Sequence, residues 1–150
     1  MTNNELISLA IKARENANVQ ISGFKVGAAL LSKDGKVISG CNIEDPSGIG
    51  ITNVCAERCA FIKAISEGIT EFSKIAVVGG PKSQDENDRN EKTNGNDSIN
   101  ELIFCSPCGA CRQYINSWSP DIKVIIREEN GEIKEYDMNQ LLPYSFNEKF

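Results

Sequence analysis

Apolar residues near the N-terminus recur at intervals of three and four positions. This spacing places them on one side of the chain and predicts an amphipathic helix over residues 4–17. Asn3 or Asn4 stands where the helix would start and could cap it. We expect the helix to bury a face formed by Leu6, Ala10, Ala13 and Ala17.

Five further apolar runs predict strands. The runs are residues 25–32, 36–42, 74–79, 121–127 and 132–136. Asp34-Gly35 separates the first two runs and Asn130-Gly131 separates the last two, and both pairs favour the tight turns of hairpins. The sequence therefore predicts two antiparallel hairpins with one buried strand between them.

Helices are predicted between these strands, over residues 55–67, 108–117 and 139–142. Helices that alternate with hairpin and crossover strands are typical of a layered α/β fold with a mixed sheet, and residues 1–150 correspond to a single domain. Residues 81–100 interrupt the pattern with eight charges, five asparagines and one large apolar residue. We expect a mobile, solvated insert there, with a functional lid as the alternative.

Charge and hydropathy narrow the class of function. The chain has 16 basic and 21 acidic residues, so its net charge is −5 and it lacks the basic footprint of a duplex nucleic-acid binder. No stretch approaches the roughly 18 apolar residues of a membrane span. The N-terminus lacks the basic and then apolar pattern of a secretory signal. We therefore expect a cytoplasmic protein with neither a nucleic-acid nor a membrane partner.

Histidine and cysteine content is the most restrictive feature of the composition. The chain has no histidine, which excludes a histidine general base, a histidine-containing catalytic triad and histidine metal ligands. It has six cysteines. In a reducing compartment, cysteines are typical of metal sites, nucleophiles or small core residues rather than of disulfides.

Three of the cysteines have the spacing of a metal site. Cys108 and Cys111 are separated by two residues, and both they and Cys55 lie at the starts of predicted helices, where free backbone N–H groups favour thiolates. Three thiolates leave one position of a tetrahedral Zn²⁺ open, which is typical of a catalytic zinc. Glu57 can approach that position without ligating the metal, and can transfer protons between a water and a substrate nitrogen.

Two other interpretations of these residues stay open. A fourth thiolate from Cys59 or Cys105 would close the site and make the zinc structural. Glu57 could serve only to stabilise the start of a helix. An iron–sulfur cluster at Cys105, Cys108 and Cys111 is disfavoured because the cysteine–proline pair that follows in bacterial ferredoxins is absent.

Segments that flank these cysteines identify a family. They are FKVGAAL from Phe24, GCNIE from Gly40, CAER from Cys55, SPCGACRQ from Ser106 and LLP from Leu141. A three-cysteine zinc site with a glutamate that is not a ligand is known in zinc deaminases. In content and order the segments resemble the small homotetrameric cytidine deaminases. The resemblance covers nearly the whole chain except the insert.

The resemblance implies one Zn²⁺ per subunit, bound by Cys55, Cys108 and Cys111. It implies that Glu57 moves protons between the bound water, ring N3 and the leaving amine. It also implies substrate contacts outside the metal site. The backbone at Ala56 would meet the base, Asn42 and Glu44 would bind the ribose hydroxyls, and Phe24 would pack near the nucleoside.

The resemblance further implies a three-layer α/β/α sandwich around a five-stranded mixed sheet. It implies a homotetramer with shared active sites, in which Phe146 reaches a neighbouring subunit and stacks on the base. One departure concerns this assembly. Residues 45–51 lack the tyrosine usual in the family and make the loop about two residues longer.

Arg58 has a physical argument of its own. Three thiolates and one Zn²⁺ sum to a charge of −1, which weakens the metal as a Lewis acid. A guanidinium beside the thiolates would offset part of that charge. We therefore expect Arg58 to tune the charge of the site.

The expected reaction is the hydrolytic deamination of cytidine, and also of deoxycytidine, to uridine or deoxyuridine and ammonia in pyrimidine salvage. A deaminase of a related cytosine-containing compound such as blasticidin S is the first alternative, and the pairing of Asn42 with Glu44 favours a ribose over it. A non-catalytic, zinc-stabilised module is the second. The intact Glu57 beside three cysteines argues against it.

Overall fold

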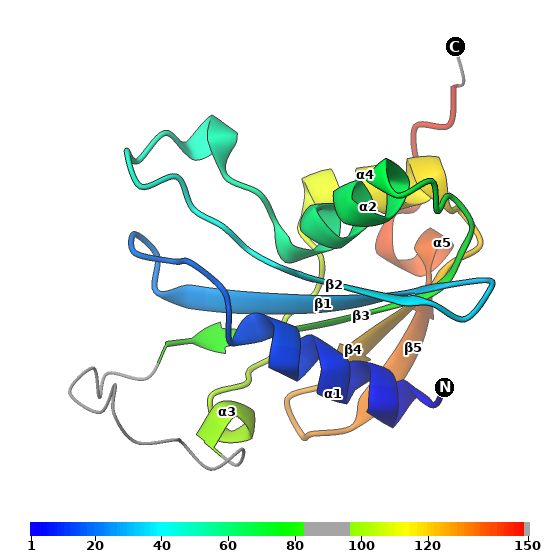
Figure 1. Cartoon of the computed structure of the whole chain (residues 1–150). Coiled ribbons are helices and arrows are strands. Elements are labelled where there is room, and N and C mark those ends of the chain that lie inside the picture. Colours follow the sequence, from blue (N-terminus) through cyan, green and yellow to red (C-terminus); the bar gives the residue numbers. More distant parts are fainter. Residues whose placement is uncertain (83–96, 149–150) are drawn as a thin grey trace.

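Five strands form one mixed sheet in the order β2-β1-β3-β4-β5 (Figure 1). In this computed structural model, residues 1–82 and 97–148 are described. The strands are β1 (Phe24–Ser32), β2 (Val37–Cys41), β3 (Phe72–Pro81), β4 (Lys123–Arg127) and β5 (Ile133–Asp137). β1 is antiparallel to β2 and β3, β3 is parallel to β4, and β4 is antiparallel to β5. Both predicted hairpins are present.

Helices cover both faces of this sheet, as Figure 1 shows. Helix α1 (Asn3–Arg14) lies on one face, and helices α2 (Ala56–Ser66), α4 (Gly109–Trp118) and α5 (Met138–Leu141) lie on the other. Successive residues of a strand point to opposite faces, so each strand contributes to two cores. The α1 core contains Leu6, Ala10, Ala29, Ala76 and Ile125, and the opposite core contains Ala28, Leu30, Phe61, Val77 and Ile115. The predicted three-layer α/β/α sandwich is confirmed.

Packing in the second core fixes α2 and α4 on the sheet. Phe61 of α2 is fully buried and meets Phe72 of β3 edge-to-face, with ring centroids 4.8 Å apart. Tyr114 of α4 meets the same ring edge-to-face at 5.9 Å. Such aromatic pairs contribute about 0.5–1.5 kcal/mol each beyond their burial. The two helices are therefore held through one shared aromatic side chain.

The start of α2 lies directly on β2. A Cβ atom at Gly40 would lie 2.4 Å from the carbonyl oxygen of Ala56 and 2.5 Å from the amide nitrogen of Ala60. Only glycine permits this approach of helix backbone to strand. Gly40 thereby sets the height of the first turn of α2 above the sheet.

Several helix and strand boundaries differ from those predicted from the sequence. Thr2, and not Asn3 or Asn4, caps α1, because its hydroxyl accepts the amide of Glu5 while the Glu5 carboxylate accepts the amide of Thr2. The helix also ends at Arg14 rather than at residue 17. Strand β3 exceeds its predicted length because it pairs with β1 from Phe72 to Pro81.

The predicted insert at about 81–100 lies mostly outside the described residues. Pro81 ends β3, and the four-residue helix α3 (Asp97–Asn100) precedes the return of the chain to the sheet. That return is marked by an isolated bridge between Gly79 and Ile103. Among residues 1–82 and 97–148, no helix is long and apolar enough to cross a membrane.

Candidate active site

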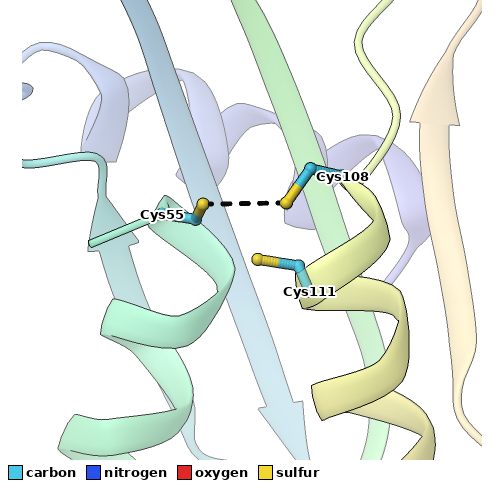
Figure 2. Close-up of side chains that lie close together, drawn as sticks. All are labelled: Cys55, Cys108 and Cys111. Carbon is cyan, nitrogen blue, oxygen red and sulfur yellow. Dashed lines mark hydrogen bonds between the residues drawn. The ribbon is translucent and has the colours of Figure 1, made fainter. Parts of the chain in front are cut away.

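The three predicted zinc ligands lie together at the starts of two neighbouring helices. Cys55 is the N-cap residue of α2, Cys108 is the N-cap residue of α4, and Cys111 lies in the first turn of α4. Their sulfur atoms all lie within 4.8 Å of one another, and Figure 2 shows them pointing toward a common centre. Neither N-cap cysteine makes a side-chain capping hydrogen bond, so both sulfur atoms are directed at the cluster instead.

This geometry fits a tetrahedral zinc ion. Zn–S bonds of about 2.3 Å separate two thiolate ligands by about 3.8 Å. The Cys55 and Cys108 sulfur atoms are 3.8 Å apart. Neither Cys59 nor Cys105 belongs to the group. The fourth thiolate of a closed structural site is therefore not in place, and one coordination position is left for a water or a substrate.

The thiols differ in their readiness to ionise. The pKa of Cys55 is lowered to about 5, first by a hydrogen bond from the Cys111 thiol and then by one from Arg58. The pKa of Cys111 is raised, because its proton is held in that hydrogen bond and its side chain is buried. Without a metal, Cys55 thus carries the negative charge of the cluster.

Arg58 lies beside this charge. Its Nη2 atom is 3.5 Å from the sulfur of Cys55, and the thiolates raise its own pKa. Its Nε atom is buried and has no hydrogen-bond partner in the structure. The side chain is therefore directed at the thiolates, although this leaves one of its donors unsatisfied.

Glu57 occupies the first turn of α2, and its side chain is only 3% exposed. Burial, and to a smaller extent the negative charge of Cys55, raise the pKa of this carboxyl to about 7, while backbone hydrogen bonding opposes the shift. A carboxyl group with this pKa is present in both protonation states near neutral pH. It can therefore serve as a base in one step and as an acid in the next.

Asn42 and Glu44 lie between the metal cluster and the start of β1. The residue between them, Ile43, forms a bridge with Val54, next to Cys55. The Asn42 side chain accepts the amide of Val26 at 2.8 Å and donates to the carbonyl of Phe24 at 2.9 Å. The Glu44 carboxylate accepts the amide and the hydroxyl of Ser22. Both predicted ribose residues therefore support the chain around Phe24.

The comparisons with known proteins agree on one family. A family model described as the cytidine and deoxycytidylate deaminase zinc-binding region matches residues 1–128. The chain belongs to the cytidine and deoxycytidylate deaminase family. The match extends over most of the chain and includes all three cysteines of the cluster.

Individual deaminases are similar over nearly the whole length. A cytidine deaminase of Halalkalibacterium halodurans is 44% identical over 142 residues, which are 94% of this chain and 91% of the relative. A blasticidin-S deaminase of Bacillus cereus is 37% identical over 121 residues, 81% of this chain and 76% of the relative. The crystal structure of a cytidine deaminase from Burkholderia pseudomallei has a TM-score of 0.76 and 36% identity, and the match covers 97% of this chain and 100% of that one.

The family model describes a zinc-binding region, and the three-cysteine cluster is a group that could hold the ion. The chain is accordingly a zinc-dependent deaminase. Its remaining predicted site residues differ in exposure. Ala56, the first residue of α2, is fully buried. The side chain of Phe146 is 59% exposed, and its carbonyl accepts a hydrogen bond from Gln113.

Two neighbours of the deaminase site, Gly79 and Arg112, were not assigned a role from the sequence, and Cys105 was considered there only as a further metal ligand. A Cβ atom at Gly79 would lie 2.6 Å from the Cys105 sulfur and 3.0 Å from the Phe24 ring, so these residues are in close contact. Burial and the nearby Glu57 raise the pKa of Cys105 to about 12, which keeps it a neutral thiol. Arg112, directly after Cys111, binds the loop before Cys108. The position of Arg112 beside a predicted metal ligand is the feature of the sequence that could have indicated a role for it.

Proposed function

We propose that this protein hydrolyses cytidine and deoxycytidine to uridine or deoxyuridine and ammonia, as an enzyme of pyrimidine salvage. One observation carries the proposal. A buried glutamate with a pKa of about 7 lies in the same helical turn as a cluster of three thiolates that leaves a metal position open. Family membership supplies the chemical class, and this geometry supplies the acid and base.

Glu57 performs the proton transfers. Zinc bound to Cys55, Cys108 and Cys111 would act as a Lewis acid that makes a water molecule easier to deprotonate. Glu57 accepts a proton from the attacking water, whose oxygen bonds to C4 of the pyrimidine, and donates it to ring N3. Glu57 then accepts the second proton, from the new C4 hydroxyl, and donates it to the exocyclic amine. The C4 carbonyl forms as the bond from C4 to that nitrogen breaks, and ammonia leaves. The buried first turn of α2 shields this carboxyl from bulk water.

Arg58 adjusts the charge in which this chemistry occurs. Its guanidinium is 3.5 Å from the Cys55 sulfur, so it offsets part of the negative charge of three thiolates. We assign it the role of keeping the metal electrophilic, whereas the cysteines hold the metal in place.

Asn42 and Glu44 are assigned to the ribose. The Asn42 amide donates one hydrogen to Phe24 and retains a second for a ligand. The Glu44 carboxylate accepts two hydrogen bonds from Ser22 and retains acceptor capacity for a hydroxyl. Phe24 would pack against the nucleoside, and the backbone at Ala56 would meet the base.

We also propose a homotetramer with shared active sites, located in the cytoplasm. Phe146 would complete the site of a neighbouring subunit, and its 59% exposed side chain supports this role. The loop that lacks the usual tyrosine contains the short 3₁₀ helix η1 (Gly50–Thr52), and Ile51 within it is 93% exposed. An exposed isoleucine here supports an apolar subunit contact in place of the tyrosine.

Ammonia release from four compounds tests the substrate assignment. Cytidine, deoxycytidine, cytosine and blasticidin S are supplied separately to zinc-loaded protein. We expect turnover of the two nucleosides and little of free cytosine, because cytosine lacks the ribose that Asn42 and Glu44 bind. A Glu44→Gln variant should raise KM for cytidine more than it lowers kcat. Preference for blasticidin S over cytidine would overturn the nucleoside assignment.

A further inference from the structure

The guanidinium of Arg112 is bonded at three points. Its Nε atom donates to the carbonyl of Pro107 at 2.8 Å, and its Nη2 atom donates to the hydroxyl of Ser106 at 3.0 Å. Its Nη1 atom donates to the carbonyl of Leu141 at 2.7 Å. Two of these bonds hold the turn just before Cys108, and the third holds the end of α5.

Among the described residues, Arg112 supplies two side-chain hydrogen bonds to the turn at the start of α4. Cys108 makes no capping hydrogen bond, because its sulfur faces the metal cluster. Its side chain is exposed, whereas Pro107 immediately before it is buried. The position of the Cys108 sulfur therefore depends on how firmly the preceding peptide is held. Arg112 holds that peptide from within the same helix, one residue beyond Cys111.

The same side of α4 also binds the C-terminal segment, residues 141–147. Gln113 donates to the carbonyl of Phe146 at 3.0 Å, and Asn116 donates to the side chain of Asn147 at 2.8 Å. Together with the bond from Arg112 to Leu141, these contacts fix the segment at both ends. One helix thus carries two metal ligands and the supports of the segment that presents Phe146.

We propose that Arg112 is a positioning residue that places Cys108 for zinc and joins the metal turn to the C-terminal segment carrying Phe146. The part that concerns Phe146 rests on the proposed function. Arg112 does this with a planar fork of donors, which bonds acceptors in three directions at once. Lysine would keep the charge at this position and lose that geometry.

The proposal assigns different tasks to two adjacent residues. Arg112 bonds both the metal turn and the C-terminal segment, whereas Gln113 bonds the segment at Phe146. Arg112→Lys should therefore affect zinc retention and KM together. Gln113→Ala should affect KM and leave zinc retention unchanged. The pair forms a matched control within one turn of helix.

The test measures zinc release to a metallochromic chelator from parent, Arg112→Lys and Gln113→Ala proteins, and then kcat and KM for cytidine. Loss of a group that orients a metal ligand typically costs about 10–100-fold in metal affinity. We expect Arg112→Lys to release zinc at least about 10-fold faster than the parent. We expect Gln113→Ala to release it at the parent rate. Both variants should raise KM.

The rates of zinc release and the turnover of cytidine together decide the proposal. Zinc release from Arg112→Lys at the parent rate would overturn it, as would equal acceleration by Gln113→Ala. If Arg112→Lys is misfolded by circular dichroism, Arg112→Gln, which keeps one donor group, replaces it under the same criterion. If the parent does not deaminate cytidine but Arg112→Lys still releases zinc faster, the positioning of Cys108 stands and the proposed function fails.

Discussion

The helices of this protein begin in two different ways. Helix α1 starts with a capping box, in which Thr2 and Glu5 bond each other's amides, and at the start of α5 the side chain of Gln140 accepts the amide of Asp137. Helices α2 and α4 start with Cys55 and Cys108, whose side chains make no capping hydrogen bond. An oxygen at the N-cap position contributes about 1 kcal/mol to stability. The two helices of the metal site lack that contribution and present sulfur at a common centre instead.

This difference shows that the same backbone position serves stability in one place and metal binding in another. At α2 and α4 the N-cap side chain is a thiol directed at the metal cluster, rather than an oxygen that accepts a backbone N–H. The Phe61 packing holds the middle of both helices on the sheet, and Arg112 binds the turn that precedes α4. We expect zinc to supply the stability that a side-chain cap supplies elsewhere.

The largest effect is predicted for Cys55→Ser, which replaces a metal ligand at the start of α2 with an ordinary N-cap residue. Cys55→Ser removes a ligand, so we expect zinc to be lost and kcat to fall by roughly 10³-fold, since the metal supplies several kcal/mol of transition-state stabilisation. The serine oxygen can cap α2, so the metal-free variant should be more stable to urea than the metal-free parent by up to about 1 kcal/mol.

Cys59→Ser is the matched control for that substitution. It changes a cysteine in the same helix that lies outside the metal group, so zinc content and kcat should stay at parent levels. Parent-level zinc and turnover in Cys55→Ser would contradict its assignment as a ligand. A metal-free Cys55→Ser protein less stable than the parent would contradict the difference between the two kinds of helix start.

Arg58→Ala tests whether Arg58 affects the reactivity of the metal without being needed to retain it. The guanidinium contacts the Cys55 sulfur and does not ligate the metal. We expect kcat to fall by about 10–100-fold while zinc content changes much less. Zinc is quantified in the same samples used for kinetics. Equal kcat in the variant and the parent at matched zinc content would remove Arg58 from the mechanism.

The raised pKa of Glu57 predicts a pH dependence in the metal-free protein. The folded-state pKa of about 7 exceeds the unfolded value of about 4.3, so folding favours the neutral carboxyl. The stability that this group contributes is fully present below about pH 4.3 and is lost as pH rises to about 7. Over that range it amounts to at most about 4 kcal/mol, at about 1.4 kcal/mol per pKa unit.

The difference between parent and Glu57→Gln isolates this effect from that of the cysteines. Urea unfolding of both metal-free proteins at several pH values gives the difference in free energy of unfolding. We expect the parent to lose stability relative to the variant as pH rises from about 4 to about 7.5. A difference that is constant with pH, or one that changes in the parent's favour, would show that burial does not raise this pKa.

The smallest effect is expected at the conventional cap of α1. Thr2→Ala removes the oxygen that accepts the Glu5 amide and should lower the free energy of unfolding by about 1 kcal/mol, with kcat unchanged. Asn4→Ala is the control, since Asn4 is exposed and is not the cap. A larger stability loss in Asn4→Ala than in Thr2→Ala would reverse the assignment of the cap.

The spacing of Cys108 and Cys111 is local information, whereas the approach of Cys55, 53 positions from Cys108, was expected from the resemblance to the family. Cys55 and Cys108 stand at predicted helix starts. The short spacing of Cys108 and Cys111 indicates that both bind the same ion. The cap of α1 was misplaced by one or two residues because Thr2, Asn3 and Asn4 are all good caps. The choice depended on Glu5, which stands three positions after Thr2.

Features that depend on contacts distant in the sequence were not predictable in the same way. Strand β3 extends beyond its apolar run because β1 provides partners for it. The role of Arg112 depends on Leu141, 29 positions away. The close approach of Cys105 to Gly79 follows from the bridge between Gly79 and Ile103. Such pairings are set by tertiary packing, and no local pattern specifies them.

The most direct test of the account compares parent and Glu57→Gln proteins at equal zinc content. Glutamine keeps the size of the side chain and cannot transfer the proton. We predict that the variant retains zinc and binds cytidine, while its rate of ammonia release in a single turnover falls by about 10²–10⁴-fold. A zinc-loaded Glu57→Gln protein that releases ammonia from cytidine at the parent rate would contradict the central role of this buried carboxyl.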